Sequence, residues 1–362
     1  MKMTVRAIAL YLPQFHPIPE NDEWWGKGFT EWTNTAKARP LFRGHEQPHV
    51  PADLGFYDLR LPEAREAQAD LARQYGLEGF CYYHYWFAGR RLLERPFEQV
   101  LASGKPDFPF CLCWANETWT GIWHGAADRI LVEQTYPGDE DHQRHFDYLL
   151  PAFEDPRYIR VDGRPLFMVY RPLNIPDPKR FTDLWRELAE KAGLPGLYLI
   201  CEHRDSDWDP HEYGFDAVML SRLPPRRAAM KKWATWANPI RKLRYWWADV
   251  RGLPTIHQYR HVLDHMITDP VPGIESYPYV VPNWDNTPRS GSNGMVLQGS
   301  TPELFRRHLR RALERVRPNT PDKRIVFIKS WNEWAEGNHL EPDLKYGHAY
   351  LQVIKEELER FE

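Results

Sequence analysis

The chain has 362 residues, of which 42% are hydrophobic and 27% charged, and its formal net charge is −3. This length suits one large domain or two smaller ones, and the balanced charge argues against a binder of duplex nucleic acid, which needs an excess of Lys and Arg to neutralise phosphates. No apolar run approaches the ~20 residues that span a bilayer, and residues 1–6 show no signal-peptide pattern. We therefore expect a soluble, cytoplasmic protein.

Short apolar runs bounded by turn residues alternate along the chain with segments of helical periodicity. This alternation predicts repeated strand–helix units around a parallel sheet. Eight such runs are present, and eight strands close a barrel. No linker divides the chain, so the sequence predicts a single (β/α)₈ TIM barrel over residues 1–362. The predicted strands are Ala7–Leu12, Gly79–Tyr85, Phe110–Trp114, Leu166–Tyr170, Leu197–Cys201, Ala217–Leu220, Tyr279–Pro282 and Ile325–Ser330.

The clearest predicted helix is Pro62–Tyr75, because a proline opens it and Gly76 follows its end. Proline is favoured in the first turn of a helix and glycine just after the last. Further helices are predicted over Phe181–Ala192, Pro302–Val316 and Gly347–Leu358.

Two connections are much longer than the 2–6 residues typical of such loops. Pro13–Leu61 follows strand 1, and an insertion over residues 222–277 follows strand 6. The insertion begins with Arg222–Arg251, which mixes Arg and Lys with Trp. One interpretation is a lid whose Trp residues pack on the barrel. The other is contact of residues 222–251 with an anionic glycolipid or a membrane surface.

Glu333 and Glu336 lie three residues apart where the eighth strand becomes a loop. Catalytic residues of TIM barrels lie at the C-terminal ends of the strands. Two carboxyl groups in different surroundings can act as acid and base, and apolar neighbours such as Trp331 and Trp334 raise a carboxyl pKa. The sequence therefore predicts Glu333 and Glu336 as the catalytic pair.

The chain holds 16 Trp, 18 Tyr and 17 Phe, many of them in predicted loops. Rings at loop tips suit sugars, which present a flat C–H face to a π-system. We expect Trp114 and Trp119 to stack on sugar, Glu117 and His84 to hold hydroxyl groups, and Asn332 to orient Glu333. The full set of predicted substrate-binding residues is Tyr11, Glu31, Trp32, Tyr83, His84, Trp86, Trp114, Asn116, Glu117, Trp119, Tyr170, Glu202, Trp331, Asn332 and His339.

We predict no cofactor and no metal. The four cysteines fall within predicted strands and lack the spacing of a zinc site, so we expect buried thiols. The spacing of the strand-end and loop histidines demands no metal either. These residues are Cys81, Cys111, Cys113 and Cys201, and His16, His84, His203 and His339.

Five segments carry an ordered set of motifs across nearly the whole chain: Leu10–His16, Gly28–Asn34, Gly79–Trp86, Cys113–Glu117 and Trp331–Gly337. Together they resemble the WbsX proteins, a group similar to glycoside hydrolase family 99. That family comprises retaining endo-α-mannosidases and endo-α-mannanases on a metal-independent (β/α)₈ barrel. The resemblance implies that Glu336 protonates the leaving oxygen and that Glu333 deprotonates the sugar 2-hydroxyl, which attacks the anomeric carbon to give a 1,2-anhydro intermediate. Ala335 replaces the family 99 histidine between the two acids, which weakens the inference of mannose specificity.

The leading function is an endo-acting glycoside hydrolase for a bacterial surface polysaccharide or O-antigen-type glycan, in which an α-mannoside-like linkage is one option. A glycosyltransferase or transglycosylase of O-antigen synthesis is the first alternative, and Asp205-Ser-Asp207 is a weak match to a nucleotide-sugar metal motif. A non-catalytic carbohydrate-binding protein is the second. Replacing each glutamate by glutamine separates an enzyme from a binding protein, which has no turnover to lose.

Overall fold

A computed structural model describes residues 5–121, 126–227, 230 and 246–361. Its centre is a closed barrel of eight parallel strands, in which neighbours in the chain are neighbours in the sheet and β1 pairs with β15. The predicted single (β/α)₈ barrel is confirmed. The barrel strands are β1 (Arg6–Tyr11), β2 (Gly79–His84), β5 (Phe110–Trp114), β9 (Arg164–Val169), β10 (Tyr198–His203), β11 (Ala217–Leu220), β13 (Ser276–Val280) and β15 (Ile325–Ile328).

Seven of the eight predicted strands match the observed bounds to within about two residues. The exception is the seventh strand in chain order. We expected Tyr279–Pro282, whereas β13 covers Ser276–Val280. Pro278 interrupts the apolar run and made its first half look like a turn, yet it lies within the strand opposite Leu220 of β11. All four cysteines are buried and free, as expected.

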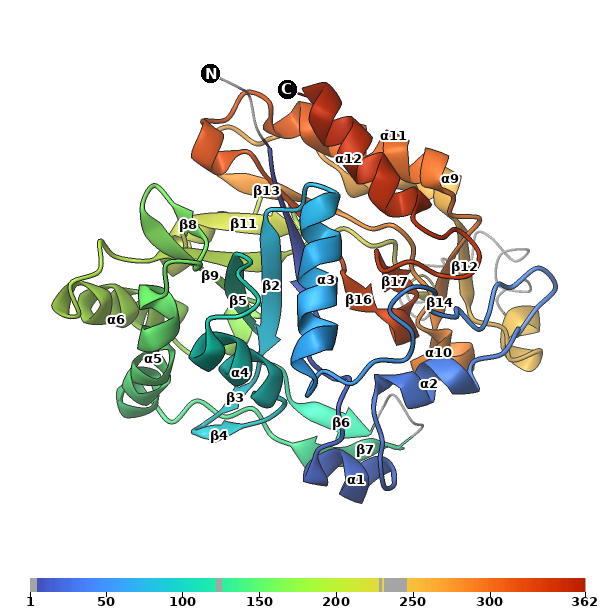
Figure 1. Cartoon of the computed structure of the whole chain (residues 1–362), viewed down its shortest axis with the longest axis horizontal. Helices are drawn as coiled ribbons and strands as arrows, with labels where there is room; N and C mark the ends of the chain where they lie inside the picture. The colour runs from blue at the N-terminus through green and yellow to red at the C-terminus, as the bar shows by residue number, and fades with distance from the viewer. Residues whose placement is uncertain (1–4, 122–125, 228–229, 231–245, 362) are drawn as a thin grey trace.

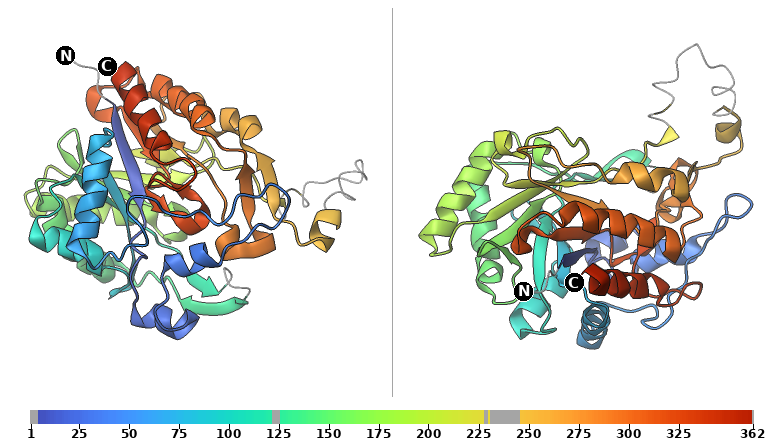
Figure 2. Two further views of the ribbon diagram at one scale, coloured as in Figure 1. Left: turned by 45° about the vertical axis from the view of Figure 1, so that its right-hand side comes forward. Right: turned by 90° about the horizontal axis from the view of Figure 1, so that it is seen from above.

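Helices form the outer layer, and α11 and α12 pack side by side (Figures 1 and 2). The connection from β10 to β11 carries only the short 3₁₀ helix η3 (Pro210–Tyr213) instead of an α-helix. The outer helices are α3 (Pro62–Gln74), α4 (Arg95–Ser103), α5 (Asp139–Glu154), α6 (Pro178–Lys191), α9 (Tyr259–Met266), α11 (Pro302–Val316) and α12 (Ala349–Phe361).

Two helices begin at other residues than predicted. α6 starts at Pro178, three residues before the predicted Phe181, because the Asp177 side chain caps it by accepting from the Arg180 backbone N–H. α12 starts at Ala349 and not at Gly347, whose φ of 51° lies in the left-handed region and cannot continue into a helix.

Additional short elements gather beyond the C-terminal ends of the strands, where the arrow of β2 points toward α1 and α2 (Figure 1). They come from the loops after β1, β2, β5, β9, β11, β13 and β15, so these loops build one face. They are α1 (Pro19–Trp25), α2 (Glu31–Lys37), β3 (Trp86–Phe87), β4 (Arg90–Arg91), β6 (Trp119–Gly121), β7 (Ala126–Val132), η2 (Pro172–Asn174), β12 (Thr255–Gln258), α10 (Thr287–Ser290), η4 (Gly291–Asn293), β14 (Met295–Gln298), β16 (Asn332–Glu333), η6 (Trp334–Glu336) and β17 (Asn338–His339).

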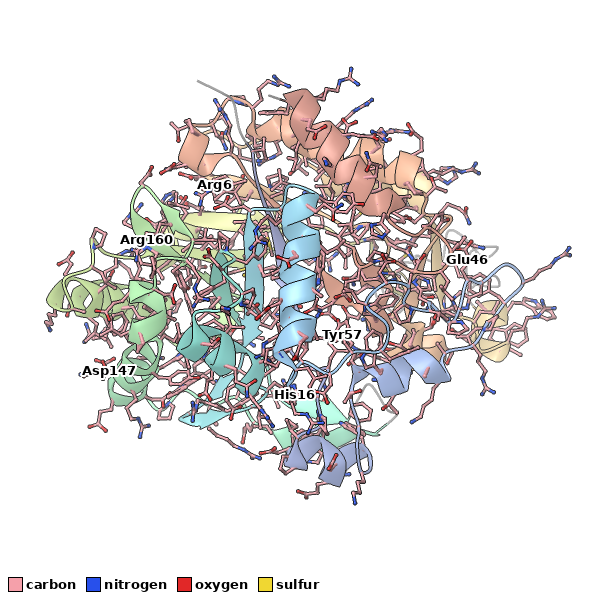
Figure 3. The ribbon with its side chains drawn as sticks, in the orientation of Figure 1. Arg6, His16, Glu46, Tyr57, Asp147 and Arg160 are labelled. Carbon is pink, nitrogen blue, oxygen red and sulfur yellow. The ribbon has the colours of Figure 1, made fainter. Side chains whose placement is uncertain are left out.

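The opposite end of the barrel is fixed by fully paired charges. Arg6 pairs with Glu78 and donates to the backbone carbonyl of Arg160, on β8 (Arg160–Val161). Figure 3 labels Arg6 and Arg160. Glu275 accepts from the hydroxyls of Tyr198 and Tyr277, at 2.5 and 2.6 Å, and from Lys323 of η5 (Pro321–Lys323), at 2.7 Å. Burial alone would raise the pKa of Glu275, but these three donors lower it below its ordinary value.

The insertion after β11 adds β12, which pairs in parallel with β14. Most of the basic and aromatic stretch Arg222–Arg251 lies outside the described residues, and its contact with a glycolipid or membrane surface stays a prediction. Within the described part, Trp246 and Trp247 are 56% and 48% exposed. Among the helices described, none has the length and apolar character needed to cross a bilayer.

Candidate active site

A small hairpin after β15 carries both predicted catalytic residues. β16 and β17 pair antiparallel, with Glu333 on the first strand and Glu336 in the 3₁₀ turn η6. The turn closes at Gly337, whose φ is +62° and where a Cβ would lie 2.9 Å from the backbone nitrogen of Asp285. Glycine is therefore required here on both conformational and steric grounds. Both glutamates are buried.

One arginine joins both carboxylates. Arg289 of α10 donates from Nη1 to Glu336 Oε1 at 2.8 Å and from Nη2 to Glu333 Oε2 at 2.9 Å. Its Nε donates to Glu31 at 2.7 Å. The Arg289 side chain is itself 14% exposed, so the three contacts are largely shielded from water. Such charge-assisted bonds fix the geometry of the pair.

The loop that carries Arg289 is fastened to the catalytic hairpin. The backbone N–H of Asp285 donates to the carbonyl of Glu336 at 2.7 Å. The Asp285 side chain accepts from the backbone N–H and the hydroxyl of Thr287, the first residue of α10, and from His45 Nε2. The hairpin and the arginine are thus positioned as one unit.

Lys329 supplies a second positive charge. Its Nζ lies 3.8 Å from Glu336 Oε2 and donates to the hydroxyl of Tyr83 at 3.1 Å. Three carboxylates, Glu31, Glu333 and Glu336, therefore share two cations. Arg226 lines the same cavity and adds a third positive charge near Glu336.

The pKa values of the two predicted catalytic residues are driven apart. Burial and the adjacent Glu336 raise the pKa of Glu333 from 4.5 to about 7. Burial would also raise the pKa of Glu336, but Arg289, Lys329 and then Arg226 lower it below its ordinary value. This order is the reverse of the roles that the resemblance implies, since it keeps the proton on Glu333.

A cavity of about 660 Å³ opens in front of this pair. Its size suits several sugar rings or a drug-sized ligand. The predicted site residues that line it are Glu31, Tyr83, Glu117, Trp119, Tyr170, Glu202, Glu333 and Glu336. The same wall includes Arg171, which pairs with Glu117 at 2.7 Å and lies 3.9 Å from Glu202. Aromatic rings and polar groups thus share one surface.

Three residues that were predicted to contact sugar, Trp86, Trp114 and His84, do not line this cavity. Trp86 and Trp114 pack around His145 of α5, with ring centroids 4.7 and 4.9 Å away, and His84 Nε2 lies 2.8 Å from His145 Nε2. Burial lowers the pKa of His84 to about 3, so its ring is neutral. The expectations that Trp114 stacks on sugar and that His84 holds a hydroxyl are wrong for this structure.

Asn116 and Asn332 also stand behind the cavity and hold its parts in place. Asn116 bonds both the N–H and the carbonyl of Arg171, each at 2.8 Å. Asn332 bonds the N–H and the carbonyl of Leu12 in the same way, at 2.7 and 3.0 Å. The Asn332 side chain therefore fixes the backbone before Glu333 and does not bond the Glu333 carboxylate.

The remaining predicted residues also lie away from the cavity. Tyr11 is buried and donates to Gln68, and Trp32 donates to the carbonyl of Tyr57. Trp331 packs on Phe80. Trp334 packs on Trp32 and donates to Glu341, and the apolar role predicted for Trp331 and Trp334 beside the glutamates stays a prediction. His339 lines a second cavity.

Sequence interpretation missed the two cations, Arg289 and Lys329. Lys329 had a visible signal, because it was a charged residue inside the predicted strand Ile325–Ser330. Arg289 had less, since it comes nine residues after the end of β13, in a loop without regular periodicity. Neither Asp205 nor Asp207 lines the cavity.

Two likenesses to solved structures bear on the fold. A "Glycoside hydrolase-like protein" superposes with a TM-score of 0.59 at 15% identity, covering 99% of this chain and 94% of that one. The GH99 endo-alpha-mannosidase from Bacteroides thetaiotaomicron gives a TM-score of 0.59 at 16% identity, covering 98% and 97%. At these identities the likeness establishes the barrel fold alone.

Sequence comparison identifies closer relatives. Proteins described as "Uncharacterized protein WxcX" from two strains of Xanthomonas campestris pv. campestris, one of them B100, are 41% identical over 354 residues, which is 98% of this chain and 49% of each relative. The chain thus spans about half the length of these relatives. The family model described as "Glycosyltransferase WbsX" matches residues 7–354. The chain therefore belongs to the WbsX family.

Proposed function

We propose that this protein is a retaining, endo-acting glycoside hydrolase that uses Glu333 and Glu336. The observation that carries the proposal is the buried pair itself, with pKa values driven apart, on the wall of a large cavity at the C-terminal ends of the barrel strands. Two carboxyl groups of different pKa are what glycoside cleavage requires. The likeness of fold to an enzyme named endo-alpha-mannosidase supports the same activity.

The proposed reaction has two steps. Glu333 takes the proton of the sugar 2-hydroxyl, the freed oxygen attacks the anomeric carbon, and Glu336 protonates the departing glycosidic oxygen. Water then attacks the anomeric carbon of the 1,2-anhydro sugar and gives its proton to Glu336. At the same time Glu333 returns its proton to the epoxide oxygen, which becomes the 2-hydroxyl again. Both residues end as they began, and the anomeric configuration is retained.

These roles require a change at Arg289. A carboxylate paired with a guanidinium resists protonation, and Arg289 contacts Glu336 at 2.8 Å. A substrate that draws the guanidinium away from Glu336 would raise its pKa and prepare it as the acid. Arg289 would meanwhile keep Glu333 and Glu31 as alternative partners, which limits the cost of opening the contact.

For the substrate we propose a bacterial surface polysaccharide or O-antigen-type glycan with an α-mannoside-like linkage. Trp119, Tyr83 and Tyr170 place aromatic rings on the cavity wall, and Glu117, Glu202 and Arg171 offer hydrogen-bonding groups for hydroxyls. The linkage rests on the printed name of the structural neighbour.

The first test is mass spectrometry of products formed from purified α-mannan and O-antigen polysaccharides in heavy-oxygen water. Wild-type protein should release oligosaccharides that carry one heavy oxygen, whereas Glu333→Gln and Glu336→Gln should release none. Absence of products from wild type, with binding intact, contradicts the hydrolase proposal and favours a carbohydrate-binding protein.

A second test assigns the two roles. An aryl glycoside with a good leaving group needs little protonation, so activity on it should survive in the variant that lacks the general acid. We expect survival in Glu336→Gln and loss in Glu333→Gln. The opposite result would exchange the roles and agree with the pKa order of the unliganded site.

A transferase is the second candidate, because the family model carries the description "Glycosyltransferase WbsX". A transglycosylase would use the same two glutamates, with an acceptor hydroxyl in place of water. Adding an unlabelled acceptor sugar to the heavy-oxygen assay distinguishes the two. Longer products without the label indicate transfer, and labelled shorter products indicate hydrolysis.

A further inference from the structure

A second cavity of about 400 Å³ lies behind the catalytic hairpin. It shares no lining residue with the larger cavity. One wall comes from His45–Val50, in the long loop that follows α2, where Figure 3 labels Glu46. The opposite wall comes from the segment that follows Glu336. It therefore lies between two loops that both help to build the active site.

Three metal-ligating side chains converge on this cavity: His49, His339 and Asp343. Their ligand atoms all lie within 4.8 Å of one another. His49 Nδ1 is 2.9 Å from His339 Nε2, and Asp343 Oδ2 is 3.9 Å from the same nitrogen. Tetrahedral zinc with ligands at about 2.05 Å has ligand-to-ligand separations of about 3.3 Å, between these two distances.

The other polar atoms of two of these side chains are already committed. His339 Nδ1 lies 2.9 Å from the carbonyl of Glu341, to which it donates. This contact leaves the lone pair of His339 on Nε2, the atom that faces His49. Asp343 Oδ1 accepts from the N–H groups of Lys345 and Tyr346, at 2.9 and 2.6 Å, which leaves Oδ2. Outer contacts of this kind orient the ligands of metal sites.

The carboxylate also lacks a fixed cation. Lys345, the nearest lysine in the chain, pairs with Glu46 instead. Across the described residues, Asp343 forms no ion pair with Lys or Arg. A divalent ion would offset its charge and let both facing ring nitrogens act as acceptors, whereas without an ion one of them must donate.

We propose that His49, His339 and Asp343 bind one divalent transition-metal ion of the zinc class, with water from the cavity as the fourth ligand. Two imidazole nitrogens and one carboxylate oxygen suit Zn²⁺ or Co²⁺, whereas Mg²⁺ and Ca²⁺ prefer oxygen ligands throughout. The site lies outside the reaction proposed above, so its ion is structural.

The ion would join the two loops that frame the active site. The chain around His49 already pairs with the chain around Asp343, since Leu344 donates to the carbonyl of Val50 and Ala52 donates to that of Pro342, both at 2.9 Å. His339 also stacks on Trp334, next to the catalytic residues, with ring centroids 3.7 Å apart. Metal binding would therefore stabilise the hairpin that carries Glu333 and Glu336.

The test is metal binding by the full-length chain, independent of any activity. Protein treated with a chelator and desalted is titrated with Co²⁺ and with Zn²⁺, following visible absorption for Co²⁺ and calorimetry for Zn²⁺. We expect a single equivalent to bind and the unfolding temperature to rise. His49→Ala and Asp343→Asn should each weaken binding roughly tenfold or more.

The matched control is His211→Ala, which removes another histidine paired with an aspartate, Asp209, at 2.8 Å but on the exposed surface. It should bind metal like wild type. Circular dichroism verifies that each variant is folded, and His49→Gln replaces His49→Ala if the latter is not. A wild-type protein without saturable binding, or a folded His49 variant that binds like wild type, would overturn the proposal.

Discussion

The barrel carries carboxyl groups at both of its ends, half-buried at one and buried at the other, and it pairs them differently. At the N-terminal end, one carboxylate, Glu275, accepts from a lysine and two tyrosine hydroxyls, and its pKa is lowered. At the C-terminal end, Arg289 is shared among three carboxylates, and the pKa of Glu333 is raised to about 7.

The difference shows that burial alone does not make a group reactive. Burial acts on Glu275 and on Glu333 in the same direction, toward a higher pKa. What separates them is the ratio of carboxylates to donors. The adjacent Glu336 adds to the effect of burial on Glu333, and groups with perturbed pKa values in a cavity are typical of catalytic sites.

The largest expected effect comes from neutralising the C-terminal pair. Glu333→Gln and Glu336→Gln should each lower turnover of a glycan by about 10²–10⁴-fold while leaving much of the binding intact, because general acid and base contributions have this size. Turnover and binding are measured on the same polysaccharide. Equal turnover in both variants and wild type would place the chemistry elsewhere.

Removing the shared cation tests the charge ratio directly. Arg289→Met should lower the free energy of unfolding by about 3–5 kcal/mol at neutral pH, because it leaves buried carboxylates without their partner. The loss should shrink below about pH 5, where carboxyl groups gain protons. Denaturant unfolding at several pH values measures it.

The control for that variant is Arg60→Met. Arg60 pairs with Asp58 on the surface, with an exposed fraction of 42%, so its loss should cost at most about 1 kcal/mol. A similar cost for both variants would contradict the view that Arg289 offsets the charge of buried carboxylates.

The pH dependence of stability should run in opposite directions at the two ends. A carboxyl group whose pKa is raised in the folded state destabilises the fold as pH rises from 4.5 through about 7, because the folded protein holds the extra proton. Relative to wild type, Glu333→Gln should therefore gain up to about 3 kcal/mol across that window. Thermal unfolding at matched pH values measures this gain, and a constant difference would contradict the raised pKa.

The smallest effect is expected at the N-terminal end. Glu275→Gln should lower the free energy of unfolding by about 1–2 kcal/mol, through the loss of one ion pair and weaker acceptance from two hydroxyls, and should leave turnover unchanged. Because the pKa of Glu275 is lowered, its stabilisation is present above its ordinary pKa of 4.5 and is lost as pH falls below it. A loss of turnover in this variant would contradict the view that the two ends of the barrel have separate roles.

Sequence reasoning recovered the barrel because each strand is a separate apolar run with clear ends. It located Glu333 and Glu336 for a similar reason, since a strand end fixes which face of a barrel a residue reaches. It failed where side-chain direction matters. Tyr83 lines the cavity, whereas its neighbour His84 lies opposite Trp114 in the register and both contact His145 of α5. Successive residues of a strand point to opposite faces, so an error of one position exchanges wall and core.

Arg289 marks a second limit, because a long loop gives no periodicity from which to infer where its residues fold back. The Glu31 contact shows the scale of the problem, since the two partners are separated by 258 positions in the chain. Only the three-dimensional arrangement reveals that one arginine holds both acids.

The hydrogen bonds between Asn332 and Leu12 limit when this part of the protein can fold during synthesis. The two residues are separated by 320 positions, and their pairing sets the backbone immediately before Glu333. A chain emerging from the ribosome cannot make this contact until residue 332 has left the exit tunnel and returned to the first strand. Partly synthesised chains therefore lack the candidate site, which is assembled only as the barrel closes.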